Sequence, residues 1–219
     1  MITYSDVKNR EEINTYIRQA DVSLKSMGYT EHSFAHVTRC AEFASAWLLE
    51  LGGTEREAEL ARIAAYMHDI GNVVNRHGHA QTGAVMAFRL LENMGMPPEE
   101  VAVVVTAIGN HDESTAHPVN SVAAALLLAD KTDVRRTRVR NDDVAAFDIH
   151  DRVNYAVTRA DTALDVEART LTLDLDVDTG ICPVMDYFEI FMGRMLLCRR
   201  AAAFFALKFR LIINGSVLM

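Results

Sequence analysis

The chain has 219 residues, half of them hydrophobic, and a formal net charge of −8 at pH 7. This composition excludes wholesale disorder, and the acidic balance argues against binding nucleic acid through bulk positive charge. No run of about 18 uncharged apolar residues occurs, so no membrane span is expected. The charged first dozen residues are unlike a secretory signal, and three widely separated cysteines favour reduced thiols in a cytoplasmic protein.

The first 135 residues are dominated by apolar spacings typical of helices. Thr54 followed by Glu57 forms the capping-box pattern at a helix start, and Gly71 is typical of a helix end. Helices are expected at 7–27, 31–51, 54–70, 79–94, 97–110 and 119–134.

The pattern changes toward the C-terminus. Residues 171–178 alternate apolar with polar or acidic side chains, which predicts a half-buried strand, and 154–166 form a weaker partner strand. Residues 184–213 are apolar around nearly the whole helical circumference, which predicts one long buried helix. We expect a mainly α fold in a single domain, with a helical core at about 30–135 and a β-hairpin plus C-terminal helix at about 150–219.

Several imidazoles and carboxylates lie on apolar faces of the expected helices. His36 shares a face with Cys40, and Asp130 shares one with Leu126 and Leu127. An unpaired buried carboxylate is costly, so such aspartates need cations. Imidazole and carboxylate groups converging from consecutive helices would form a site suited to Fe, Mn, Zn, Co or Mg.

In chain order, His36, the His68-Asp69 pair and Asp130 form an H…HD…D series. With the segments HSFAHVTRCAEFA, AAYMHDIGN and LLLADKTDVRR, the sequence resembles the HD-domain superfamily of metal-dependent phosphohydrolases over about residues 30–135. The resemblance implies an all-helical HD core in which these four residues bind metal and phosphate esters or anhydrides are hydrolysed.

Two more histidines extend the resemblance to binuclear members of the superfamily, which have the longer pattern H…HD…H…H…D. The resemblance then implies two divalent ions, of Fe, Mn, Zn or Mg, bridged by Asp69, and attack on phosphorus by metal-bound hydroxide. The implied metal ligands are His36, His68, Asp69, His79, His111 and Asp130. His77 is a rival for His79, and His32 is expected to cap a helix or to be exposed.

The substrate is left open. The chain has no GYP motif, and Asn110 stands where the cyclic-dinucleotide phosphodiesterases have a second histidine, so the resemblance is closer to small bacterial proteins such as diadenosine-tetraphosphate hydrolases. One alternative is a mononuclear, 5′-nucleotidase-like centre in which His79 and His111 bind phosphate. Another is a non-catalytic, ligand-sensing module.

A run of basic residues begins beside Asp130 and comprises Lys131, Arg135, Arg136, Arg138 and Arg140. An acidic protein that acts on a polyanion needs a local positive site, and guanidinium groups match phosphate oxygens in pairs. We expect Lys131, Arg135 and Arg136 to bind substrate, and Lys131 and Arg135 to act in catalysis with Asp69. A solvated helix end is the alternative interpretation. Asp112 and Glu113 are interpreted as carboxylates that support the metal ligands, as proton-transfer groups or as exposed residues.

The expected partners follow from the same features. A small phosphorylated substrate, with a nucleotide favoured, is expected, and neither nucleic acid nor a membrane. A helix as apolar as 184–213 must enter the core of its own subunit or meet a partner. We expect a homodimer whose interface includes this helix and the hairpin.

Overall fold

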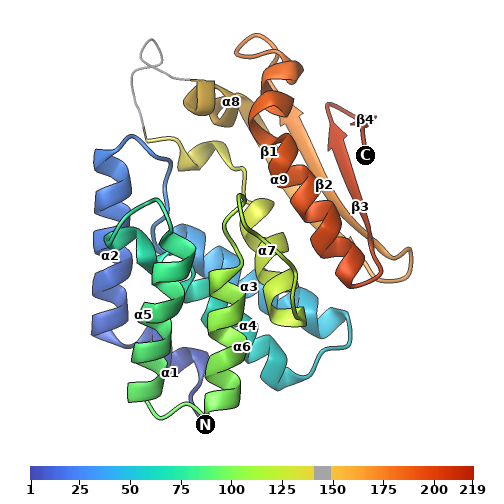
Figure 1. The fold of residues 1–219 in the computed structure, drawn as a ribbon. Helices are drawn as coiled ribbons and strands as arrows, with labels where there is room; N and C mark the ends of the chain where they lie inside the picture. The colour runs from blue at the N-terminus through green and yellow to red at the C-terminus, as the bar shows by residue number, and fades with distance from the viewer. Residues whose placement is uncertain (141–148) are drawn as a thin grey trace.

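The computed structural model describes residues 1–140 and 149–219 and confirms a mainly α fold. The helical part lies at the lower left of Figure 1, and a small sheet with its long helix lies at the upper right. The helical part comprises α1 (Tyr4–Lys8), α2 (Glu11–Ser26), α3 (Phe34–Glu50), α4 (Glu55–Met67), the 3₁₀ turn η1 (Ile70–Val73), α5 (His79–Asn93), α6 (Pro98–Gly109), α7 (Ser121–Lys131) and the 3₁₀ turn η2 (Arg136–Arg138). The C-terminal part comprises α8 (Ile149–Ala156), β1 (Val157–Asp165), β2 (Thr170–Val177), α9 (Val184–Phe204), β3 (Lys208–Ile213) and β4 (Ser216–Val217).

Helix α7 is the centre of the bundle. Its residues from Val122 to Lys131 are all buried, and it packs against α3, α4 and α6. The apolar side chains of this helix contribute to the stability of the core, because burial of each Val or Leu side chain is worth about 1.5–3 kcal/mol. The last turn carries Asp130 and Lys131 into the same interior. Two charged residues are thereby held with little of their surface exposed.

The turn after α4 sets the position of α5. Thr54 and Glu57 make the expected capping box at the start of α4. Because α4 ends at Met67, His68 and Asp69 lie at its junction with η1. Gly71 then passes so close to α5 that a Cβ atom there would lie 2.0 Å from the carbonyl oxygen of His79. Only glycine fits this approach, which brings the start of α5 beside the His68-Asp69 pair.

The sheet has four strands in the order β1-β2-β3-β4. Strands β1 and β2 form the expected antiparallel hairpin, β2 and β3 pair in parallel, and β3 and β4 pair antiparallel. Leu171, Leu173 and Leu175 pair with Phe209, Leu211 and Ile213, and all six are buried. Helix α9 connects the parallel strands and packs against β3 and α7, as a parallel crossover requires.

Two expectations about the C-terminal part are wrong. The helix expected at 184–213 ends at Phe204, and residues 208–213 form β3. Alternating burial of Phe209 and Leu211 with exposed Lys208 and Arg210 is a strand pattern, which the long apolar run obscured. The strand expected at 154–166 starts at Val157, because the three residues before it complete α8.

The apolar surface of α9 is buried largely within its own chain. Tyr187, Phe191, Met195, Leu197 and Cys198 are among its buried residues, whereas Met185, Met192 and Phe204 are exposed. Of the two alternatives, the helix therefore enters the core of its own subunit, and the homodimer stays a prediction. Among the described residues, no helix combines the length and hydropathy needed to cross a bilayer.

Candidate metal centre

Six of the expected metal ligands meet at one place inside the helical part. His36 comes from α3, His68 and Asp69 from the α4–η1 junction, and Asp130 from the last turn of α7. His79 opens α5, and His111 follows α6 by two residues. All six side chains are buried. The helices thus bring together residues that are separated by up to 94 positions in the chain.

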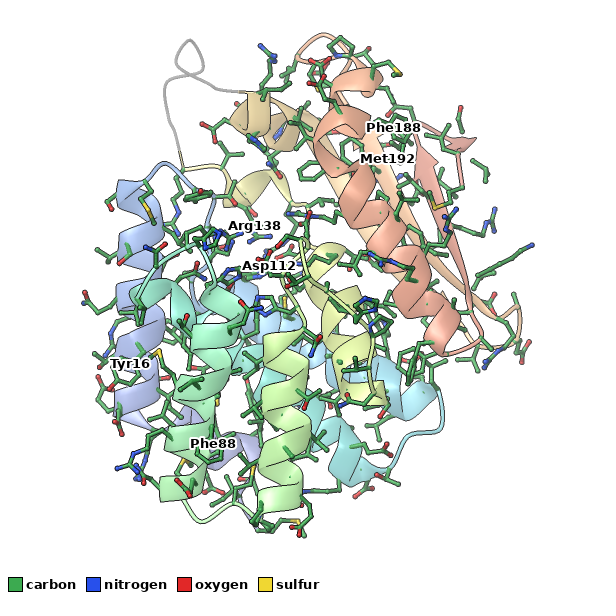
Figure 2. All side chains as sticks on the ribbon, in the orientation of Figure 1. Tyr16, Phe88, Asp112, Arg138, Phe188 and Met192 are labelled. Atoms are coloured by element: carbon green, nitrogen blue, oxygen red, sulfur yellow. The ribbon has the colours of Figure 1, made fainter. Side chains whose placement is uncertain are left out.

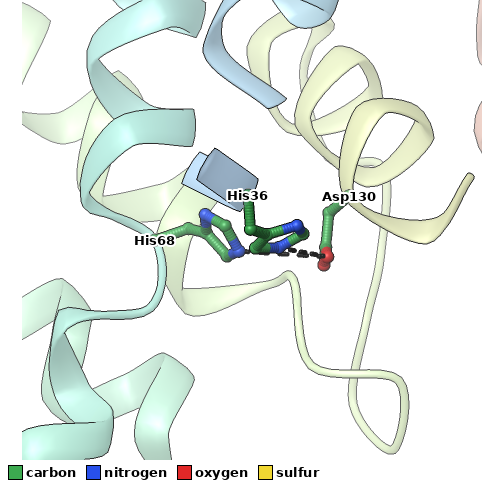
Figure 3. A group of neighbouring side chains, drawn as sticks. All are labelled: His36, His68 and Asp130. Carbon is green, nitrogen blue, oxygen red and sulfur yellow. Dashed lines mark ion pairs between the residues drawn. The ribbon is translucent and has the colours of Figure 1, made fainter. Parts of the chain in front are cut away.

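The first group contains His36, His68 and Asp130 (Figure 3), whose candidate ligand atoms lie within 4.8 Å of one another. The Nε2 atom of His36 is 3.3 Å from Oδ1 of Asp130, and Nε2 of His68 is 3.9 Å from the same oxygen. Two imidazole nitrogens and one carboxylate oxygen therefore face a common point, an arrangement that suits a divalent ion.

The second group shares His68 with the first and adds Asp69 and His111, again with ligand atoms within 4.8 Å. The Nε2 atom of His79 lies beside this group, 3.1 Å from Nε2 of His111 and 3.7 Å from Oδ1 of Asp69. The other oxygen of Asp69 is 3.1 Å from Nε2 of His68. Asp69 thus has one carboxylate oxygen toward each set of histidines, as a bridging ligand would.

Backbone carbonyl groups orient three of the four imidazoles. The Nδ1 atoms of His68, His79 and His111 lie 2.7, 3.0 and 2.6 Å from the carbonyl oxygens of Ala65, Arg76 and Ile108. Because a carbonyl only accepts, each Nδ1 donates, and Nε2 is left with its lone pair toward the centre when the ring is neutral. This is the tautomer a metal ligand needs.

The charge state of the cluster also suits a cation. Burial opposes ionisation of Asp69 and Asp130, but His68 beside the first and Lys131 beside the second hold both carboxyl pKa values well below their usual range. Burial and the proximity of His111 lower the pKa of His79 to about 4. Nε2 of His68 and Oδ2 of Asp69 lie 3.1 Å apart, but they form no hydrogen bond with each other or with any other described residue, and both are buried. Such orphaned atoms are costly, and a bound divalent ion would satisfy both.

Sequence reasoning missed Asp133, which completes the surroundings of His36. Its Oδ2 atom lies 2.8 Å from Nδ1 of His36, so the imidazole donates to a carboxylate behind it. Burial opposes ionisation of Asp133, but the hydrogen bonds from Arg135 and His36 lower its pKa strongly. Asp133 lies just beyond the end of α7, and its partner His36 is 97 positions earlier in the chain, so residue spacing alone offers no sign of this contact.

Arg135 and Arg136 lie elsewhere than the phosphate-binding prediction placed them. Arg135 donates from Nε and a terminal nitrogen to the two oxygens of Asp133, at 2.5 and 2.9 Å. Arg136 lies over the ring of Tyr155, 4.4 Å from its centre. Neither residue lines the cavity at the metal centre. Arg135 is paired with a buried carboxylate, and Arg136 is stacked on an aromatic ring while its Nε atom and one terminal nitrogen have no hydrogen-bond partner among the described residues. The spacing of the basic run could not reveal these contacts.

The candidate ligands Asp69, His79, His111 and Asp130 line a cavity of about 550 Å³. It lies between the helical part and α9, where Figure 2 labels Asp112 and Arg138. His32 also lines it, contrary to the expectation of a cap or an exposed residue, and its ring lies edge-on to His36. Among the described residues, the Lys and Arg side chains on the wall are Arg76, Lys131, Arg138 and Arg194.

Lys131 lines the cavity beside Asp130, and its expected part in substrate binding and catalysis stays a prediction. Its Nζ atom is 2.6 Å from Oδ2 of Asp130, on the opposite oxygen from the histidines. On the facing wall, Glu113 accepts a hydrogen bond of 2.7 Å from Nε of Arg194. Burial opposes ionisation of Glu113, but the charges of Arg194 and Lys131 lower its pKa. Glu113 is therefore an ionised part of the cavity wall.

The buried cluster of histidines and aspartates, carried by helices, defines a helical protein with a candidate metal centre. Comparison with known proteins gives its family. The model of the HD domain matches residues 33–152, more than half of the chain. The chain belongs to the HD domain family.

Two relatives show the extent of the similarity. The uncharacterized protein MJ1020 of Methanocaldococcus jannaschii is 26% identical over 159 residues, which make up 63% of this chain and 61% of that protein. The chain therefore matches less than two thirds of that relative's length. A crystal structure of a predicted HD superfamily hydrolase from an uncultured Thermotogales bacterium is 27% identical, covers 57% of this chain and 68% of its own, and has a TM-score of 0.45.

Proposed function

We propose that the protein is a metal-dependent phosphohydrolase that acts on a small phosphorylated molecule. The observation that carries this proposal is the cluster of buried histidines and aspartates, with two orphaned polar atoms, at the wall of a cavity that also presents four cationic side chains. Membership of the HD domain family supports it. Cationic groups beside a divalent metal site are suited to phosphoryl oxygens.

His36, His68 and Asp130 would hold one divalent ion, and Asp69, His79 and His111 would hold a second. Divalent ions at these positions would make a water molecule nucleophilic near neutral pH and offset charge on the phosphoryl oxygens. The carbonyl groups behind the imidazoles fix their tautomers, and Asp133 holds His36 in place. The ammonium group of Lys131 would stabilise charge that develops on the phosphoryl group.

The walls farther from the cluster favour a nucleotide as substrate. The volume of about 550 Å³ suits a small molecule. Tyr29, Ile190 and Phe191 would offer apolar surface to the base of a nucleotide. Lys131 and the arginines of the cavity wall would contact its phosphate groups. The guanidinium carbon of Arg76 lies 5.3 Å from the centre of the Tyr29 ring, and both residues line the cavity.

A phosphate-release screen tests the proposal. The protein, loaded separately with Mn, Fe, Zn and Mg, is offered nucleoside monophosphates, dinucleoside polyphosphates and p-nitrophenyl phosphate. We expect release from at least one ester or anhydride and its loss on chelation. Asp69→Asn should lower the rate by about 100-fold or more, since removing a ligand costs at least what removing an outer partner does. Exposed Asp161→Asn is the matched control.

Failure of the fully loaded protein to release phosphate from any of these compounds would contradict catalysis and favour the ligand-sensing alternative. The metal content of two variants distinguishes a binuclear from a mononuclear centre. If His79→Ala and His111→Ala leave the saturating metal content unchanged but weaken phosphate binding, the centre is mononuclear.

A further inference from the structure

We propose that Arg194, on the C-terminal helix α9, binds the phosphate group of the substrate together with Lys131. This inference rests on the proposed function and deepens it, because it gives the C-terminal part of the chain a role in the site. Arg194 lies 64 residues after Asp130 in the sequence, yet both line the same cavity. The packing of α9 against α7 brings them there.

Arg194 is held in a fixed orientation on the cavity wall. Its Nε atom donates to Oε1 of Glu113 at 2.7 Å, and its guanidinium carbon lies 4.7 Å from the centre of the Phe191 ring. Glu113 is itself placed two residues after His111, a candidate metal ligand. A guanidinium group that is already oriented loses less conformational freedom when it binds an anion.

The two terminal nitrogens of Arg194 have no hydrogen-bond partner among the described residues, since the pairing with Glu113 uses Nε. A guanidinium group in this state presents a pair of N–H groups that matches two phosphate oxygens. The side chain is 22% exposed, and Arg194 is one of the residues that line the cavity. In the free protein Glu113 offsets the charge of Arg194, and the two terminal nitrogens of Arg194 are left to bind an anion.

Two other arginines near the centre, Arg138 and Arg135, each donate hydrogen bonds from two nitrogens, whereas Arg76 contacts its neighbours through one. Arg138 donates from Nε and a terminal nitrogen to the carbonyl oxygens of Glu31 and Asp133. Arg76 has one terminal nitrogen 3.3 Å from Oδ1 of Asn72 and 3.4 Å from Nε2 of His79. Arg135 is paired at both ends with Asp133. Arg194 therefore takes over the phosphate-binding role that the basic run suggested for Arg135.

Binding of inorganic phosphate to the metal-loaded protein, measured by titration calorimetry, tests the proposal without catalysis. Arg194→Ala should weaken phosphate binding by about 10-fold or more, and Arg194→Lys should fall between this variant and the wild type. Both should keep the wild-type metal content. Arg199→Ala, an exposed arginine on the same helix, is the matched control and should bind phosphate as the wild type does.

With an ester that the wild type hydrolyses, Arg194→Ala should also raise KM or lower kcat/KM, with metal affinity unchanged. Phosphate binding by Arg194→Ala as tight as in the wild type would overturn the proposal and leave the proposed function standing. Wild-type protein that binds no phosphate in the millimolar range would overturn it too. Phosphate binding that depends on Arg194, in a protein that hydrolyses nothing, would support the subsite and refute the proposed catalysis.

Discussion

His36 lies between two carboxylates that have different tasks. Asp130 faces its Nε2 atom at 3.3 Å, and Asp133 accepts from its Nδ1 atom at 2.8 Å. Asp133 in turn accepts hydrogen bonds from Nε and one terminal nitrogen of Arg135. An arginine that sequence spacing assigned to phosphate therefore orients a candidate metal ligand through one intervening carboxylate.

This chain of contacts predicts the effect of Asp133→Asn. The amide keeps the size of the side chain but loses the charge that favours the His36 tautomer with Nε2 free. Metal affinity should fall by about 10–100-fold, the usual cost of losing such a partner. Chelator competition measures it, with exposed Asp161→Asn as the control. An unchanged affinity in folded Asp133→Asn would show that Arg135 and Asp133 only support the core.

The candidate ligands could be predicted from the sequence because their order along the chain and their placement on apolar faces are local features. Asp133, Glu113 and Arg194 could not be predicted in the same way. Asp133 and its partner His36 are 97 residues apart, and Glu113 and Arg194 are 81 residues apart. Each pair forms only when the helices pack. Arg194 in particular interrupts an otherwise apolar stretch, a weak signal of a cavity.

At the scale of the elements, the junction of η1 with α5 determines where the second half of the centre lies. A Cβ atom at Gly71 would lie 2.0 Å from the carbonyl oxygen of His79 and 2.4 Å from the backbone nitrogen of Gly83. Both neighbours are backbone atoms, so neither can rotate away. Any larger residue at Gly71 must push α5, and with it His79, away from Asp69.

We therefore expect Gly71→Ala to lower the free energy of unfolding by about 3 kcal/mol or more, the upper range for overpacking, and to weaken metal binding. Denaturant unfolding measures the first effect. Gly193→Ala is the control, because nothing lies within 4 Å of a Cβ atom there and alanine favours a helix. Equal stability of the two variants would show that the junction yields without cost.

The same scale shows where element prediction succeeded and where it failed. The capping box at Thr54 and the alternation in β2 are properties of a few neighbouring residues, and both are confirmed. Strand β3 pairs in parallel with β2 across α9, so its partner is more than 30 positions away. The sign of β3 in the sequence is therefore only the alternation of polar and apolar residues over Lys208–Ile213. This short pattern directly follows the apolar sequence of α9 and is easily assigned to the same helix.

At the scale of the whole molecule, the C-terminal part does more than cover the helical core. Helix α9 packs against β3 and α7, and many of its side chains are buried. Helix α9 also supplies Ile190, Phe191 and Arg194 to the cavity wall. The arrangement predicts that metal binding belongs to the helical core and that substrate binding needs both parts of the chain.

Metal content is the measurement that tests the central claim most directly. Wild-type protein loaded with a divalent metal and freed of excess should hold about two ions per chain by elemental analysis. Asp69→Asn should hold fewer, because it changes the carboxylate that faces both groups of histidines. Wild-type protein that retains no metal, or an Asp69→Asn variant that retains as much as the wild type, would contradict the account.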